Sequence, residues 1–135
     1  MIRYFAAAGL LLSLSACSPG TDKTAAGADP YAGLQPQIAA WHDAIENNHV
    51  ACQNKINGKG CESFEVTCKA AQDITPDEKT AGVTAKVIAA MSFSARTPDG
   101  SSGKPGSAFA TFSKANGSWT RAEAKPVNMS SCAPL

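Results

Sequence analysis

Apolar residues at steps of four, three and four positions predict an α-helix in the first half of the chain. They are Leu34, Ile38, Trp41 and Ile45. Pro36 suits the first turn of this helix, where its missing N–H leaves no hydrogen bond unmade. The polar residues from Asn48 to Asn54 predict that the helix ends or frays there. Because so short a helix is marginal by itself in water, we expect its apolar stripe to pack on a sheet.

Alternation of apolar and polar residues predicts four β-strands after the helix. Their ranges are 61–70, 83–95, 107–115 and 118–124. The second strand is the longest alternation and places Val83, Ala85, Val87, Ala89, Met91, Phe93 and Ala95 on one face. We therefore expect it in the centre of the sheet. Residues 71–82 are expected to form a connector with a helical turn, and residues 97–106 an exposed loop rich in Gly, Pro and Ser.

The last two strands flank Asn116 and Gly117, a pair that tolerates the positive φ angles of a tight hairpin turn. A two-residue turn sets the register Lys114 opposite Trp119, Phe112 opposite Arg121 and Phe109 opposite Ala124. Phe109, Ala122 and Ala124 suit the face toward the helix. The other face would carry Phe112 and Trp119 beside Lys114 and Arg121. The alternation alone does not decide which face is buried. We interpret the aromatic and basic residues as cross-strand packing rather than as a ligand patch.

The order of these elements predicts an α+β fold, in which one N-terminal amphipathic helix packs on three to four antiparallel strands and disulfides add stability. In outline, this order is similar to cystatin-like and nuclear-transport-factor-like domains. The similarity concerns topology only, so it implies no function. We assign residues 34–135 to this single globular domain.

The chain begins with a positive charge and an apolar run that leads to a cysteine. Arg3 precedes the apolar segment Tyr4–Leu14, as in a secretory signal peptide. The segment is well short of the ~20 residues that span a bilayer as a helix. It ends in Leu14-Ser15-Ala16-Cys17, a pattern that resembles the lipobox of bacterial lipoproteins. The alternative is an ordinary secreted protein with a cysteine near its cleavage point.

The resemblance implies that residues 1–16 are a signal peptide and that Cys17 becomes the lipid-modified N-terminus. Several acyl chains on one residue give stable anchoring, whereas a single chain holds only marginally. Ser18 follows the cysteine in place of Asp, which implies sorting to the outer membrane, with the domain facing the periplasm. Residues 17–33 comprise this cysteine and a tether that we expect to be flexible, since it is small, polar and interrupted by Pro and Gly.

Four cysteines remain beyond Cys17: Cys52, Cys61, Cys68 and Cys132. In an oxidising compartment they predict two disulfides; a zinc site is the alternative, but no Cys-x-x-Cys pair occurs. Three connectivities are possible, and a Cys61–Cys68 bridge is disfavoured because the two residues have opposite parity on one strand. We predict Cys52–Cys61, because a Gly-rich turn brings these residues together. We also predict Cys68–Cys132, with Cys68 pointing into the core on the same face as Val66.

Charge gives no indication of a nucleic-acid partner, because basic and acidic residues are equal in number once Arg3 is removed. One polar cluster has the spacing of a metal or acid–base site. His42, Glu46 and His49 follow one flank of the helix, with Asp43 beside them. A solvated helix face requires the same spacing, and we favour that interpretation. We therefore predict no metal ion, no cofactor and no catalytic residue.

These features favour a small lipoprotein anchored in the outer membrane through Cys17. We expect a non-enzymatic binding or structural module with an envelope protein as its partner. One alternative is a small enzyme with a pocket between helix and sheet, using His42, Glu46 or His49. Another is an inhibitor of a hydrolase such as lysozyme. We do not find the Ser-Gly-containing inhibitory loop of the lysozyme-inhibiting lipoproteins, which argues against that alternative.

Overall fold

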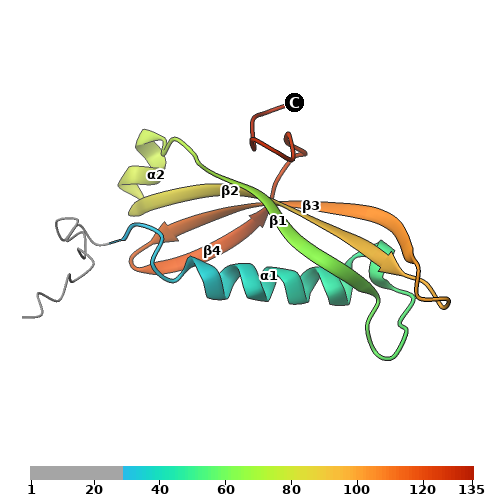
Figure 1. Ribbon diagram of the computed structural model, residues 1–135. Coiled ribbons are helices and arrows are strands. Elements are labelled where there is room, and N and C mark those ends of the chain that lie inside the picture. The colour runs from blue at the N-terminus through green and yellow to red at the C-terminus, as the bar shows by residue number, and fades with distance from the viewer. Residues whose placement is uncertain (1–28) are drawn as a thin grey trace, which may run out of the picture.

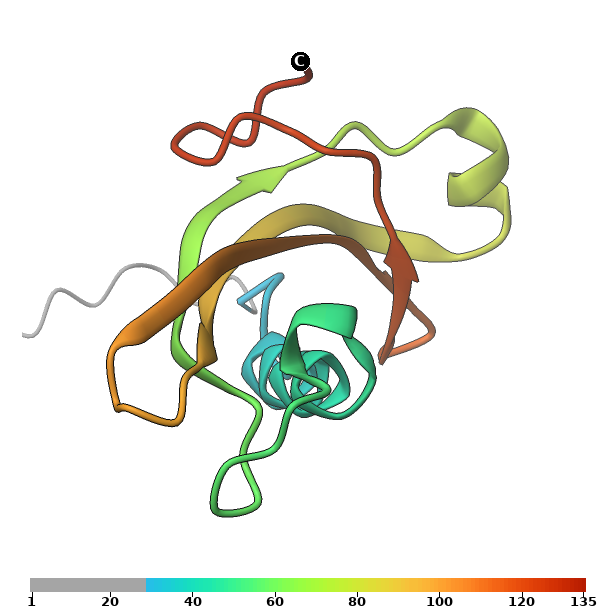
Figure 2. The same ribbon diagram turned by 90° about the vertical axis from the view of Figure 1, so that its right-hand side faces the viewer.

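A single long helix lies across the concave face of a curved four-stranded sheet (Figures 1 and 2). The structure is a computed structural model that describes residues 29–135. The Leu14–Cys17 motif, the proposed lipidation site Cys17 and the first part of the tether lie outside the described residues.

The elements follow the predicted order. Helix α1 covers Leu34–Asn48, and a 3₁₀ turn, η1, covers Val50–Cys52. The strands are β1 (Cys61–Ala71), β2 (Val83–Arg96), β3 (Ser102–Ala115) and β4 (Ser118–Glu123), and helix α2 (Pro76–Thr80) connects β1 to β2. Neighbouring strands are antiparallel in the order β1-β2-β3-β4. The predicted α+β fold is confirmed.

The predicted apolar stripe attaches α1 to the sheet. All four of its residues are buried: Leu34, Ile38, Trp41 and Ile45. The indole of Trp41 meets the ring of Phe112 on β3 edge-on, with 5.6 Å between ring centroids. Full burial of a large apolar side chain contributes roughly 1.5–3 kcal/mol. The stripe therefore supplies the stability that a helix of this length lacks in water.

The face of β2 that the alternation singled out forms the centre of the core. Ala85, Val87, Ala89, Met91 and Phe93 all belong to the buried cluster beneath α1. Phe93 lies over Gly106 of β3, where an added Cβ would come within 2.3 Å of the Phe93 ring. Residue 106 must therefore be Gly while Phe93 keeps this position. β3 starts at Ser102, before the expected Ser107, so the exposed loop is shorter than predicted.

The β3–β4 hairpin has the predicted turn and register. Asn116 and Gly117 have φ angles of 51° and 79°. Lys114 pairs with Trp119, and Phe112 pairs with Arg121. The φ angles at the turn match the right-handed twist of the strands, which is why this short sequence sets the pairing by itself.

The buried face of that hairpin, which the alternation left undecided, is the one with Phe112 and Trp119. These two residues face α1 and are only 0% and 9% exposed, so the suggestion that Phe109, Ala122 and Ala124 face the helix is wrong. Two large aromatic rings remove more apolar area from water than one Phe and two Ala. The Nε1–H of Trp119 also donates a hydrogen bond to the carbonyl of Ala32, at 2.9 Å. Trp119 is therefore part of the packing between the sheet and the segment that leads into α1.

A β-bulge in β1 changes the face on which Cys68 lies. Val66 pairs with Met91 on the core face, but Cys68 pairs with Ala90, because Thr67 is an extra residue in the strand. Cross-strand partners share a face of the sheet, so Cys68 points away from the core. The prediction that Cys68 lies on the same face as Val66 is wrong, because strict alternation does not anticipate a bulge.

Both predicted disulfide pairs are nevertheless present. Cys52 and Cys61, with Cα atoms 4.9 Å apart, join η1 to β1 inside the core. Cys68 and Cys132, with Cα atoms 5.7 Å apart, join β1 to the C-terminal tail. This tail crosses the outer face of the sheet, opposite α1 (Figure 2), where Cys132 Sγ lies 3.7 Å from the carbonyl oxygen of Ile88. The connectivity is confirmed, but the second bridge lies outside the helix–sheet core.

Candidate functional site

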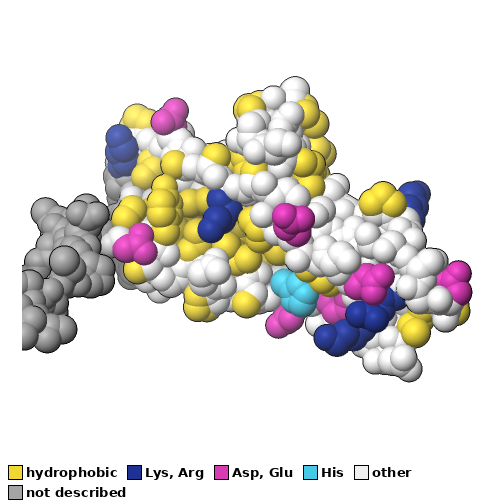
Figure 3. Space-filling model, viewed as in Figure 1, with side chains coloured by type: hydrophobic (Ala, Val, Ile, Leu, Met, Phe, Trp, Pro, Cys, Tyr) yellow, Lys and Arg dark blue, Asp and Glu magenta, His cyan; other side chains and the backbone are white. Residues whose placement is uncertain are grey.

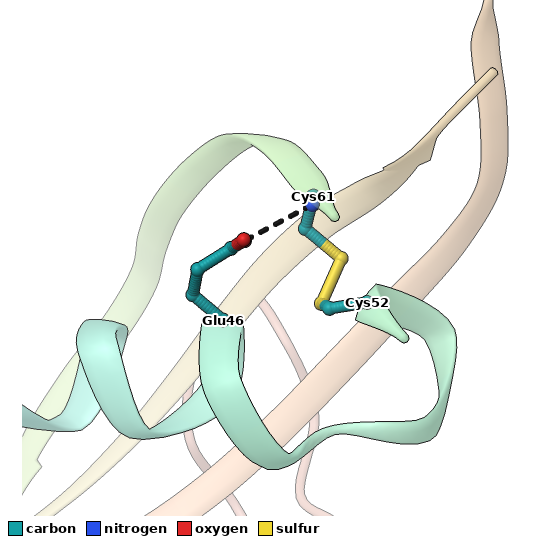
Figure 4. Close-up of side chains that lie close together, drawn as sticks. All are labelled: Glu46, Cys52 and Cys61. Atoms are coloured by element: carbon teal, nitrogen blue, oxygen red, sulfur yellow. Dashed lines mark hydrogen bonds between the residues drawn. A yellow bond between two sulfur atoms is a disulfide. The ribbon is translucent and has the colours of Figure 1, made fainter. Parts of the chain in front are cut away.

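Glu46 fastens the loop between η1 and β1 to helix α1 (Figure 4). Its carboxylate accepts hydrogen bonds from the backbone N–H groups of Gly60, at 2.6 Å, and Cys61, at 3.0 Å. The ammonium group of Lys55 donates to the same carboxylate at 2.8 Å, and also to the backbone carbonyl of Glu46. The Cys52–Cys61 disulfide closes this loop beside the carboxylate. Glu46 therefore has a structural role.

Gly60 is essential to this arrangement. A Cβ at Gly60 would lie 1.7 Å from the carbonyl oxygen of Cys52. A side chain would therefore push the loop away from η1 and pull the N–H of Gly60 off the Glu46 carboxylate. The hydrogen bond and the disulfide both depend on this close approach of two backbone segments.

The same contacts decide the charge of Glu46. Burial raises the pKa of Glu46, but the hydrogen bonds from Lys55, Gly60 and Cys61 outweigh burial and hold this pKa below its ordinary value. The carboxylate is thus ionised at neutral pH. General acid catalysis near neutrality requires a carboxyl group whose pKa is raised, so the environment of Glu46 does not suit that role.

The structure places two residues of the polar cluster on the helix flank, His42 and Glu46, on one side of α1 and the third, His49, on the other. His42 and Glu46 line one hollow, of about 260 Å³, on the β1 side of α1. The His42 ring packs against Phe64, with 4.0 Å between ring centroids. Its Nδ1 lies 3.1 Å from the carboxylate of Asp43. Asp43 is on the same helix, so this contact does not join α1 to the sheet.

His49 faces a different hollow, on the β4 side of α1. It is the C-cap of α1, and its Nδ1 accepts a hydrogen bond from the N–H of Ala51, at 3.1 Å. Its ring packs edge-on against Phe93, with 4.8 Å between centroids. The imidazole thus caps the N-terminus of η1 and packs on Phe93 of the core. It does not face the same hollow as His42.

Within residues 29–135, one group of three potential metal ligands comes together: Glu46, Cys52 and Cys61, whose ligand atoms lie within 4.8 Å of one another. Both sulfur atoms belong to a disulfide. Zinc is bound by thiolate sulfur, which this pair does not offer while it is oxidised. The group is therefore a disulfide with a carboxylate beside it.

The hollow on the β4 side, which we call the β4-side hollow, has a volume of about 290 Å³. It is lined from α1 and its C-cap by Trp41, Ala44, Ile45, Asn48 and His49. From the sheet it is lined by Ala108, Arg121 and Glu123. Arg121 Nη1 and Glu123 Oε1 form an ion pair of 2.9 Å on its wall. The hollow thus combines an apolar floor with a polar rim, an arrangement typical of binding sites.

A more apolar cleft lies at the other end of α1, where β1 rises away from the helix (Figure 1). It has a volume of about 250 Å³ and is lined by Tyr31, Leu34, Lys69, Ala70, Ala71 and Val87. Figure 3 shows the hydrophobic surface between α1 and β1, with a positive side chain in it. Tyr31 is 42% exposed and lines this surface. We call this surface the apolar cleft.

Comparison with known proteins adds no assignment: no protein family, curated protein or solved structure matches this chain. The two disulfides indicate an oxidising location outside the cytoplasm. No helix within residues 29–135 is long and apolar enough to cross a membrane.

Sequence reasoning singled out His49 and Arg121 but did not bring them to one hollow, and it missed Asn48, Ala108 and Glu123. Glu123 has the same strand parity as Trp119, so its position could have been read from the sequence once the buried face of the hairpin was known. No sequence pattern indicates the hydrogen bonds that Glu46 accepts from Gly60 and Cys61. They depend on a loop that meets the helix only in the folded chain.

Proposed function

We propose that the protein is a small lipoprotein of the bacterial cell envelope and that it is a non-enzymatic binding module. Cys17 would carry the lipid anchor and hold the domain at the outer membrane, facing the periplasm. The domain itself would bind an envelope protein.

The resemblance of Leu14–Cys17 to a lipobox supports the anchor. The two disulfides support a location where thiols are oxidised. Several acyl chains on Cys17 would hold the domain stably at a membrane surface, without a spanning helix.

One observation carries the binding role. The groups on α1 that have acid–base or metal chemistry are engaged in contacts that hold the fold together, while the surfaces that stay open beside α1 are partly apolar. Glu46 binds two backbone N–H groups and Lys55, and His49 caps η1. The β4-side hollow and the apolar cleft remain open. Open apolar surface with a polar rim marks a site of association.

Metabolic labelling with an alkyne analogue of palmitate tests the anchor. We expect label on the wild-type protein, a mature N-terminus at Cys17, and recovery in the outer-membrane fraction. The Cys17→Ser variant should stay unprocessed and unlabelled. An unlabelled wild-type protein, or a mature N-terminus at another residue, would show that the anchoring proposal is wrong.

Photo-crosslinking in living cells tests the binding role. A photoreactive amino acid at Asn48, which is exposed and lines the β4-side hollow, should capture one discrete envelope protein. Asn47 is also exposed and does not line the hollow, so the same probe there is the matched control. Equal patterns of crosslinks from the two positions, or none from either, would contradict the proposal.

A further inference from the structure

The tail after β4 folds back on itself and does not join the sheet as a strand. The N–H of Cys132 donates to the carbonyl of Asn128, at 2.8 Å, and the N–H of Asn128 donates to the carbonyl of Ala133, at 2.9 Å. An isolated bridge joins the two ends of this segment. We call residues 127–134 the tail turn. Its own hydrogen bonds hold its shape, so it can move as one unit.

The tail turn is held to the sheet by few contacts. In the described part of the chain, the polar contacts between residues 125–135 and the sheet are made by sulfur. Cys68 Sγ lies 3.5 Å from the carbonyl oxygen of Asn128, and Cys132 Sγ lies 3.7 Å from that of Ile88. Both sulfur atoms belong to the disulfide and carry no hydrogen to donate. The covalent bond between Cys68 and Cys132 is therefore the main link between the tail turn and the strands.

Apolar packing adds little to this link. Cys132 is the one buried residue of the tail turn, and Val127 and Met129 are half-buried. A hollow of about 470 Å³ lies between the tail and the sheet, lined by Val127 and Cys132 from the tail and by Ile88 from β2. Figure 2 shows the tail standing off the outer face of the sheet. Such a space forfeits the contacts that close packing would give, so the tail turn is poorly packed.

The backbone of Cys132 is strained. Its φ angle is 58°, in the left-handed region that a residue with a Cβ seldom adopts. Such a conformation costs free energy and persists only where the surroundings hold it in place. Here the disulfide fixes the side chain of Cys132 to β1. Opening the bond removes this constraint, so the strain favours release of the tail turn.

The two disulfides differ in how far a reagent can reach them. Cys52 and Cys61 are 1% and 2% exposed and lie in the core beneath α1. Cys68 is half-buried on β1, which is an edge strand of the sheet. Thiol–disulfide exchange requires a thiolate to reach one of the two sulfur atoms. The bridge of the tail is therefore the one open to exchange in the folded domain, with Cys68 Sγ as the atom attacked.

We propose that the Cys68–Cys132 bond is a site of thiol–disulfide exchange with a protein dithiol of the thioredoxin type. Its reduction releases the tail turn and uncovers Ile88 on the outer face of the sheet, while the helix–sheet core stays folded. The redox state of the bridge thereby sets which surface the outer face presents. This inference goes beyond the proposed binding role, and it holds whether or not Cys17 carries lipid.

The exchange balances with the dithiol as the sole reductant. One thiolate of the dithiol attacks Cys68 Sγ, the bond between the two sulfur atoms breaks, and Cys132 leaves as a thiolate. The second thiol of the reductant gives up its proton and displaces Cys68 from the mixed disulfide. Each cysteine takes up a proton from water as it leaves. This chain thus gains two electrons and ends with two thiols, and the reductant ends as a disulfide.

The experiment reduces the purified, oxidised chain with thioredoxin, its reductase and NADPH. Free thiols, Cys17 included, are first blocked with N-ethylmaleimide, so the result is separate from the test of the lipid anchor. Newly formed thiols are trapped with iodoacetamide over time and located by peptide mass spectrometry. We expect label at Cys68 and Cys132 to appear about tenfold faster than at Cys52 and Cys61, because exchange at a buried sulfur requires the core to open first. Equal rates, faster label at the buried bridge, or no label at all would overturn the proposal.

Hydroxyl-radical footprinting of the same samples shows whether the tail leaves. Ile88 and Val87 are neighbours on β2 and are 4% and 3% exposed, but Val87 belongs to the core beneath α1 and Ile88 lies under the tail. We expect reduction to increase the oxidation of Ile88 and to leave Val87 unchanged. An unchanged Ile88 after reduction of Cys68 and Cys132 would overturn the proposal. A gain at both residues would overturn it as well, because the core would then depend on this bridge.

Paired variants supply a readout that needs no reductant. Cys68→Ala/Cys132→Ala should show the footprint of the reduced form and should not change when thioredoxin is added. Cys52→Ala/Cys61→Ala is the matched control and should keep the oxidised footprint until thioredoxin is added. Circular dichroism shows whether each variant folds, and the wild-type measurements decide the matter if one does not. An oxidised footprint in folded Cys68→Ala/Cys132→Ala would mean that packing holds the tail, which would overturn the proposal.

Discussion

The two faces of the sheet are covered by different means. On the concave face, α1 inserts four buried side chains between itself and the strands. On the outer face, the tail after β4 lies across the sheet without regular secondary structure beyond one isolated bridge. Among residues 29–135, the buried hydrophobic residues outside the main core cluster are Ile88, Ala90 and Cys132. The Cys68–Cys132 disulfide attaches the tail to this outer face.

The difference shows how much apolar area a segment needs to stay in place without a covalent bond. Ordering one residue of backbone costs about 1–2 kcal/mol. The stripe on α1 offsets this cost through burial, whereas a tail with a single buried side chain, Cys132, does not. The crosslink therefore has a greater role on the outer face than packing has.

Trp41→Ala should give the largest loss of stability, because it removes the largest buried side chain between α1 and the concave face of the sheet. We expect a decrease of about 3–5 kcal/mol in the free energy of unfolding, the usual cost of emptying a large buried aromatic site. Urea denaturation followed by fluorescence of Trp119 would measure it. Ile88→Ala, at a site on the outer face that is 4% exposed, is the comparison and should cost about 2 kcal/mol. Equal losses would contradict the contrast between the faces.

Removing the disulfides one at a time sharpens the contrast. The Cys68–Cys132 bridge spans 64 positions and the Cys52–Cys61 bridge spans 9. In the loop-closure treatment these lengths correspond to about 4 and about 2.5–3 kcal/mol. The Cys68→Ala/Cys132→Ala variant should thus lower the melting temperature more than Cys52→Ala/Cys61→Ala. It should also make the tail sensitive to protease at temperatures where the core stays folded. A tail that stays resistant would mean that packing alone holds it.

Glu46→Ala should have a smaller effect than either change. It leaves the N–H groups of Gly60 and Cys61 without their acceptor, and hydrogen bonds to a charged group contribute about 1.5–3 kcal/mol. Water can replace the carboxylate as acceptor and restore part of this free energy, so we expect a loss of about 1–2 kcal/mol in the free energy of unfolding. The helix should keep its circular dichroism, while hydrogen exchange in residues 53–60 should become faster. Asp43→Ala, one turn earlier on the same helix, is the control and should change neither.

Acidification should have the smallest effect on stability of these changes. It should act on Asp99, in the loop that precedes β3. Hydrogen bonds from Thr97 and Ser101 lower the pKa of Asp99 from 3.8 to about 2. A carboxyl group whose pKa is lower in the folded state stabilises the fold above its unfolded pKa and loses this effect as it is protonated. Stability from Asp99 should thus be lost between about pH 4 and pH 2. Melting curves of wild type and Asp99→Asn should converge over that range. A difference that is constant with pH would contradict this account.

Local patterns predicted much of this fold. The helical stripe from Leu34 to Ile45, the hairpin turn at Asn116 and the register of β3 with β4 all depend on segments of a few residues. Periodicity and turn chemistry act within such segments, so they can be read before any tertiary contact is known. The disulfide pairs were also predictable, although the reason given for Cys68 was wrong.

The candidate site was less predictable, because its parts meet only in the folded chain. Spacing along α1 placed His42, Glu46 and His49 on one flank. It did not show that Glu46 binds the backbone of a loop or that His49 faces the opposite hollow. The partners of these side chains are backbone groups and ring faces, and neither leaves a pattern in the sequence.

The sequence by itself determined which segments become helix and strand, how the hairpin is paired and which cysteines join. Only the tertiary structure decided which face of the hairpin is buried and on which side of the sheet Cys68 lies. All apolar faces of the chain compete for burial. The face with Phe112 and Trp119 is buried because Trp41 packs against Phe112, and both aromatic residues belong to the core cluster beneath α1. A single bulge at Thr67 then reversed the side of the sheet to which the C-terminal tail is bound.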